Sequence, residues 1–71
     1  STDLAGKIQL SKNLLEKSQF IEALVAIQEV VASDKNNAEA QYLLGLALGF
    51  TGEDLQSEQA FERAEQLGYQ F

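Results

Sequence analysis

Residues 43–54 read LLGLALGFTGED, and this leucine-rich stretch decides how the chain folds. It holds Gly45, Gly49 and Gly52, although a glycine inside a helix costs about 1 kcal/mol relative to alanine. The stretch can therefore be helical only if its glycines serve close packing or turning. The sequence on either side indicates which role each of them has.

Helical patterns recur along the rest of the chain. Apolar residues at helical spacing predict helices over residues 4–17, 19–33 and 38–50. Glu53 and Asp54 open a fourth helix, because acidic side chains stabilise a helix N-terminus, and Gly68 ends it. Asn36 with Glu39 resembles a capping box at the start of the third helix. No stretch alternates with the period of a strand, so we expect an all-α fold.

The composition bounds the chemistry. The chain has 71 residues and contains no Cys, His, Met, Trp or Pro. We therefore expect one small domain, residues 1–71, without a disulfide or a thiolate-held metal. Without a histidine base or a cysteine nucleophile, we expect no enzyme, no catalytic residue and no cofactor. The carboxylates of Glu58, Glu62 and Glu65 share a helix face, which we interpret as a solvated convex surface rather than a metal site.

The net charge of −6 is uneven along the chain. Residues 36–71 carry six acids and only Arg63 as a cation, so we expect no nucleic-acid partner. A basic or apolar protein or peptide fits this half better, although the charge can also serve solubility alone. Residues 42–50 form the longest run free of strongly polar side chains, too short for membrane insertion. A soluble, cytoplasmic protein is the default expectation, and the compartment stays unknown.

The chain also matches itself at a shift of 34 residues. Small residues mostly fall on small ones and large apolar residues on large ones. The matched pairs are Leu10 with Leu44, Ser11 with Gly45, Leu14 with Leu48, Ser18 with Gly52, Ala23 with Ser57, Ala26 with Ala60, Ile27 with Phe61 and Val30 with Ala64. Each unit is thus predicted to be a helix, a tight turn and a second helix.

With this period the sequence resembles the tetratricopeptide repeat family. In the second unit L-G-x-x-L and S-x-x-x-F-x-x-A are similar to family motifs, as are L-S-x-x-L and A-x-x-x-I-x-x-V in the first. The matching positions are Leu44, Gly45, Leu48, Ser57, Phe61 and Ala64, and Leu10, Ser11, Leu14, Ala23, Ile27 and Val30. The chain departs from the family at Lys7 and Gln41, where tryptophan is frequent, and at Lys35 and Tyr69, where proline is frequent. The resemblance implies two stacked helical hairpins, repeats of about 4–37 and 38–71, in a short right-handed solenoid.

The three glycines have different predicted roles. We expect Gly45 to face the partner helix of its hairpin, where a side chain would hold the two backbones apart. Gly52 is expected in the turn, where glycine adopts a positive φ at little cost. Gly49 has neither role. Our hypothesis is that its missing side chain admits a partner's backbone or the ring of Tyr69.

The predicted third helix is apolar on all sides, which is typical of a helix buried on all sides. One sector, Gln41, Leu44, Gly45 and Leu48, is expected to face the core, and the opposite sector is left over. Three alternatives for burying the rest of this helix stay open: a following repeat over Leu43 and Ala47, the tail of the chain, or a second chain or peptide. The tail would use Leu67, Tyr69 and Phe71.

The family resemblance implies that ligands bind the concave surface, formed by the first helix of each hairpin. The predicted groove therefore comprises Ile8, Lys12, Leu15, Tyr42, Leu46, Gly49 and Phe50. Ile8, Leu15 and Leu46 can instead be plain core residues, and Lys12 a solvated charge. Some family members grip a carboxylate terminus with Lys and Asn residues, but the corresponding positions here hold Ile8, Lys12 and Leu43. Recognition of chaperone C-terminal tails is therefore not expected.

We thus expect a protein–protein interaction module that binds an apolar peptide or an amphipathic helix in its groove. The alternative is a structural element that self-associates through the same surface. Solenoids generally need three or more repeats, so we expect either a fragment of a longer protein, packed against neighbouring repeats, or a homodimer.

Overall fold

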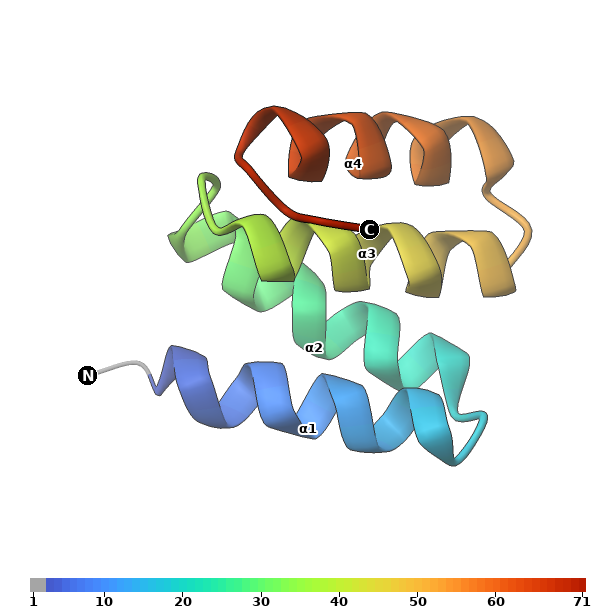
Figure 1. Ribbon diagram of the computed structural model, residues 1–71. Coiled ribbons are helices and arrows are strands. Elements are labelled where there is room, and N and C mark those ends of the chain that lie inside the picture. The colour runs from blue at the N-terminus through green and yellow to red at the C-terminus, as the bar shows by residue number, and fades with distance from the viewer. Residues whose placement is uncertain (1–2) are drawn as a thin grey trace.

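The computed structural model describes residues 3–71, which form four helices and no strand (Figure 1). Helix α1 spans Leu4–Glu16, α2 spans Phe20–Ser33, α3 spans Ala38–Phe50 and α4 spans Asp54–Gln66. The all-α prediction is confirmed, and its boundaries differ from the observed ones by a residue or two. No helix in this part of the chain is both long and apolar enough to cross a membrane.

Successive helices run in opposite directions and pack as two hairpins (Figure 1). Helix α1 packs on α2, and α3 packs on α4. The hairpins meet mainly where α2 lies against α3, and α1 also touches α3. Helix α3 is therefore the one element that contacts all three others, which explains why its sequence is apolar on more than one side.

The two hairpins have the same turn geometry at an offset of 34 residues. The backbone N–H of Gln19 donates to Leu14 O over 2.9 Å, and that of Glu53 donates to Leu48 O over the same distance. Gly52 has a φ of 88°, as expected, and Ser18 at the equivalent place has a φ of 61°. The left-handed residue of each turn thus falls at the matched position, although only one of the two is glycine.

The start of α3 differs from the prediction. Asn37, rather than Asn36, is the N-cap residue, and its side chain accepts a 3.0 Å hydrogen bond from the Ala40 N–H. The predicted capping box is wrong because Glu39 lies one position too early to return the bond. Glu39 instead reaches across to α1, where its carboxylate pairs with Lys12 at 2.5 Å.

The hydrophobic core lies between α1, α2 and α3. It consists of aliphatic side chains that are at most 9% exposed: Ile8, Ile27, Val30, Ala40, Leu43 and Ala47. One of the three alternatives for covering α3 was a following repeat over Leu43 and Ala47, and for these two residues it is wrong. Both side chains pack inside this core because α3 lies across the first hairpin.

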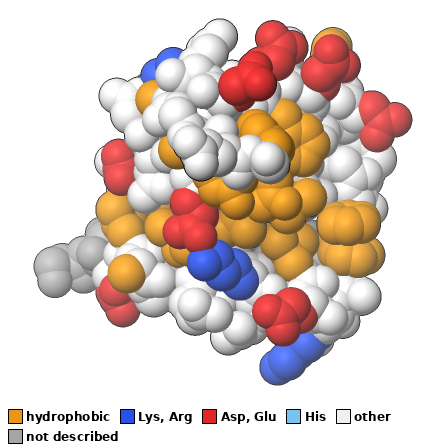
Figure 2. All heavy atoms as spheres, viewed as in Figure 1, with side chains coloured by type: hydrophobic (Ala, Val, Ile, Leu, Met, Phe, Trp, Pro, Cys, Tyr) orange, Lys and Arg blue, Asp and Glu red, His pale blue; other side chains and the backbone are white. Residues whose placement is uncertain are grey.

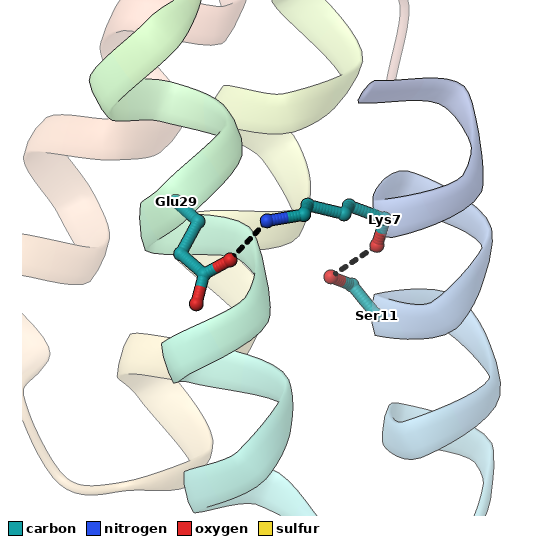
Figure 3. A network of polar contacts seen from close by, with 3 residues as sticks. All are labelled: Lys7, Ser11 and Glu29. Atoms are coloured by element: carbon teal, nitrogen blue, oxygen red, sulfur yellow. Dashed lines mark hydrogen bonds and ion pairs between the residues drawn. The ribbon is translucent and has the colours of Figure 1, made fainter. Parts of the chain in front are cut away.

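Polar groups between α1 and α2 are satisfied locally (Figure 3). The Ser11 side chain is fully buried, and its hydroxyl donates a 2.9 Å hydrogen bond to Lys7 O. The Lys7 ammonium extends from α1 to form an ion pair with the carboxylate of Glu29 on α2. The small hydroxyl at this position is tolerated in the interior because the helix's own backbone accepts its proton.

Helices α3 and α4 are held closer by glycine. A Cβ atom placed on Gly45 would lie 2.5 Å from Phe61 Cε1, so no side chain fits between this backbone and the aromatic ring. The Ser57 hydroxyl donates a buried 2.6 Å hydrogen bond to Gly45 O. Gly45 thus has the packing role that the sequence predicted.

Gly49 lies one turn further along the same contact. A Cβ atom there would be 3.1 Å from Ser57 Oγ, tight but less severe than at Gly45. The ring of Tyr69 does not lie in this gap, because it stacks on Tyr42 instead. The hypothesis that Gly49 admits Tyr69 is therefore wrong, and Ser57 is the neighbour that limits the space.

Substitution of Gly45 and Gly49 by alanine separates packing from helix propensity. Each change raises the free energy of unfolding by about 1 kcal/mol through higher helix propensity. Gly45→Ala must also displace Phe61 from a packed contact, which typically costs about 1–3 kcal/mol. We expect Gly45→Ala to lower the free energy of unfolding by about 1–2 kcal/mol relative to Gly49→Ala, measured by urea denaturation. Equal stability of the two variants would contradict the close contact at Gly45.

Candidate partner-binding groove

The chain after α4 folds back over α3 (Figure 1). Gly68, with a φ of 97°, turns the backbone, and the Tyr69 ring stacks on Tyr42 with centroids 4.4 Å apart and planes at 13°. The Phe71 ring contacts the rings of Tyr42 and Phe61 edge-on, with centroid distances of 5.5 and 5.9 Å. Each such pair contributes about 0.5–1.5 kcal/mol beyond its buried area. The tail is thus one cover of α3, as the sequence allowed.

The tail leaves an open groove between α3 and α4. Its floor is formed by the half-buried side chains of Tyr42, Leu46 and Phe61, and the exposed Phe71 of the tail also lines it. The volume is about 590 Å³. The groove continues along α3 past Leu46 to Gly49 and Phe50. We call this surface, from Phe71 to Phe50, the α3–α4 groove.

One edge of the α3–α4 groove is acidic. The exposed carboxylates at this edge all come from α4: Asp54, Glu58, Glu62 and Glu65. Their spacing of four, four and three residues places them on one helix face. Figure 2 shows acidic side chains gathered on the α4 side of a continuous apolar patch. The sequence expected a convex face; the side chains are exposed, but they border the groove.

The acidic row is extended rather than clustered. Within residues 3–71, no group of three or more acidic side chains is arranged to hold a metal ion. The row also has no cation of its own: the ion pairs found in this part of the chain are Lys7–Glu29 and Lys12–Glu39. Arg63, the cation of α4, points to another groove and donates to Asn36 Oδ1.

The predicted residues of the first hairpin do not line this groove. Ile8 belongs to the core with only 9% of its surface exposed, so its assignment to the groove is wrong. It is buried because α3 packs over α1. Leu15 packs against the same core, and Lys12 is engaged by Glu39. The groove is therefore a feature of the second hairpin alone.

The predicted residues of α3 remain accessible to different extents. Tyr42 is half-buried under the tail, and Leu46 lies in the middle of the groove floor. Phe50 is 58% exposed and stacks on Phe20, with ring centroids 4.4 Å apart. Phe50 thus connects the two hairpins at the far end of the groove.

Three features of the groove were missed as site residues: Phe61, Phe71 and the acidic row. Phe61 was assigned only a structural role. Its position, three residues after Glu58 and four before Glu65, places an aromatic ring beside the acidic row on one face of α4. That spacing is the sequence pattern that could have identified the groove edge.

A second apolar groove lies between α1 and α2. Its apolar lining consists of Leu10, Leu14, Ile21, Val25 and Ala26, and the Lys7–Glu29 ion pair lies at its edge. At the 34-residue shift, Leu10 and Leu14 correspond to Leu44 and Leu48, which share a groove with Val31 and Ala32 of α2. We call this second surface the α1–α2 groove.

The chain matches no protein-family model, no curated protein and no solved structure. The assignment of the α3–α4 groove therefore depends on its own geometry and charge.

Two groups beside the groove have shifted pKa values. The hydrogen bond from Lys12 to Glu39, together with the Glu39 charge, raises the pKa of the Lys12 ammonium. Burial raises the pKa of the Tyr69 hydroxyl above its usual 10.0, and the neighbouring Tyr42 and Glu39 act in the same direction while Lys12 opposes them. Both protons are thus held more firmly in the folded chain than in the unfolded one.

This shift predicts an alkaline loss of stability. Above its ordinary pKa of 10.0, Tyr69 loses its proton first in the unfolded chain, so the folded state binds more protons and stability falls as pH rises. Tyr69→Phe keeps the stacked ring without the titrating hydroxyl. We expect a smaller fall in Tm between about pH 9 and 11 for this variant than for the native chain. Equal falls in the two proteins would exclude Tyr69 as a source of the pH dependence.

Proposed function

We propose that this chain is a protein-interaction module of the tetratricopeptide type, whose α3–α4 groove binds an amphipathic helix or an apolar peptide. The proposal is carried by the apolar floor of Tyr42, Leu46 and Phe61, which stays open although Phe71 of the tail contacts Tyr42. An open apolar groove between two helices suits an amphipathic helix or an apolar peptide laid into it.

The repeat assignment is supported by the offset between the hairpins. Shifting the bounds of α1 by 34 residues gives those of α3, and the two turns share their hydrogen bonds. The motif residues Gly45 and Phe61 meet in space, as a repeat with that motif requires. The right-handed solenoid arrangement is part of the proposal.

An occupant of helical form suits the shape of the groove. Helices α3 and α4 run antiparallel (Figure 1). The side-chain ridge of a third helix can pack into the groove between two such helices. Gly45 and Gly49 line the α3 side of this groove beside Leu46 and place no side chain in it. Side chains at i, i+3, i+4 and i+7 of a bound helix can therefore reach the floor.

Self-association through the same surface is the alternative, and the charge distribution opposes it. Each copy has a net charge of −6 and presents a row of carboxylates at the groove edge. Two copies that face each other through this groove would bring like charges together as the interface desolvates. Capture of a different partner is therefore the better supported function.

We propose no catalytic role for the groove. Its hydroxyl closest to the α3 backbone, on Ser57, donates to Gly45 O and is held there by a 2.6 Å bond. The chain contains no histidine or cysteine to assist it.

Substitution of Leu46 tests the proposal. The probe is a labelled synthetic helix with leucine at i, i+3, i+4 and i+7 and glutamine elsewhere. We expect Leu46→Asp to weaken its binding at least about tenfold, because a carboxylate in the apolar floor must be desolvated. The matched control is Leu10→Asp, which places the same charge in the α1–α2 groove and is expected to leave binding unchanged.

The readout is fluorescence anisotropy, with circular dichroism to verify folding and light scattering to give the oligomeric state. Unchanged binding by a folded Leu46→Asp variant would contradict the proposal. Loss of a dimer in that variant, without any peptide binding by the native chain, would favour the self-association alternative.

A further inference from the structure

We infer that the α3–α4 groove selects a cationic amphipathic helix, whose lysine or arginine side chains lie over the acidic row of α4 while its apolar side chains contact Tyr42, Leu46 and Phe61. This inference rests on the proposed function of the groove. It adds the charge and the orientation of the partner.

The two edges of the α3–α4 groove differ in charge. The α4 edge carries four exposed carboxylates, and Phe61, an apolar ring of the floor, lies among them on the same helix. The α3 side contributes the uncharged residues Tyr42 and Leu46, and Glu39 at its start already pairs with Lys12. A bound helix would therefore meet negative charge along one flank only.

The carboxylates of the acidic row have no counter-charge among the described residues. Neither of the ion pairs in residues 3–71 involves the row, and Arg63 lies in the groove on the opposite side of α4. Like charges four residues apart on a helix repel each other, as Asp54 and Glu58 do, and so do Glu58 and Glu62. A cationic partner relieves this repulsion as it binds, whereas an acidic one increases it.

The length of the acidic row suits a bound helix of about three turns. From Asp54 to Glu65 the row extends along roughly 16 Å of helix axis, or about three turns. A bound helix of similar length can place cations at i, i+4 and i+7 on the flank beside its apolar stripe. Each cation then lies over one or two carboxylates at the edge of an apolar floor, where water screens the attraction less than on an open surface.

The α1–α2 groove does not have this property. Its floor is also apolar, but its Lys7 and Glu29 neutralise each other in an ion pair. Among the described residues, Glu22 is then the one charged side chain of this groove outside such a pair. A cationic helix would gain little there. The two grooves have similar apolar linings, so their charge patterns decide which of them suits a cationic helix.

The test uses three labelled peptides with the same leucine stripe and different flanking residues: lysine, glutamine or glutamate. We expect the lysine peptide to bind the native chain about tenfold or more tightly than the glutamate peptide, with the glutamine peptide between them. The difference should shrink as salt rises from about 50 to 300 mM, because the groove edge is open to screening.

A pair of double variants locates the attraction. Glu58→Gln with Glu62→Gln removes two charges from the row, and Glu16→Gln with Glu22→Gln removes two exposed charges elsewhere. We expect the first pair to weaken the lysine peptide by roughly three- to tenfold and to leave the glutamine peptide unchanged. The control pair should change neither by more than about twofold.

The outcomes separate this inference from the proposed function. Equal binding of all three peptides, abolished by Leu46→Asp, would keep the interaction module and overturn the cationic partner. Equal weakening by both double variants would show attraction to net charge and would also overturn the inference. Binding of none of the peptides, or a dimer closed through the groove, would overturn both proposals.

Discussion

The approach of α3 to α4 at Gly45 is the constraint on which the rest of the structure depends. Because this residue has no side chain, the ring of Phe61 lies directly against the α3 backbone, and the Ser57 hydroxyl reaches Gly45 O. Helix α3 can then be packed by the first hairpin on one side and by α4 on another. The same approach places Phe61 in the groove floor and brings the acids of α4 to its edge.

Much of this arrangement could be predicted from local patterns. Apolar spacing located three helices, and the acids at its start with Gly68 at its end located the fourth. Gly45 and Gly52 indicated a close contact and a left-handed turn, both of which the structure confirms. Such features depend on residues near one another in sequence. The shift of the α3 cap from Asn36 to Asn37 shows the limit, since either of two adjacent asparagines is a favourable N-cap residue.

The groove could be predicted only in part, because a helical wheel gives the faces of a helix but not the element that covers each face. The sequence left Ile8 open between the groove and the core. Helix α3 lies over α1 and buries Ile8, and the same crossing buries Leu43 and Ala47. The tail was one of three candidate covers, and only tertiary contacts show that Tyr69 and Phe71 lie on Tyr42. The acidic row was recognised as one face, but its place beside the groove depends on how α4 is rotated against α3.

We propose that the second hairpin binds a cationic helix between α3 and α4. The most direct measurement is the change in backbone amide NMR shifts as the lysine peptide is added to the isotope-labelled native chain. We predict that the shifted amides lie along the groove, at Leu46, Gly49, Glu58 and Phe61, with little change at Leu10, Ile21 and Val25. Shifts centred on the α1–α2 groove, or spread evenly over the acidic surface, would contradict the account.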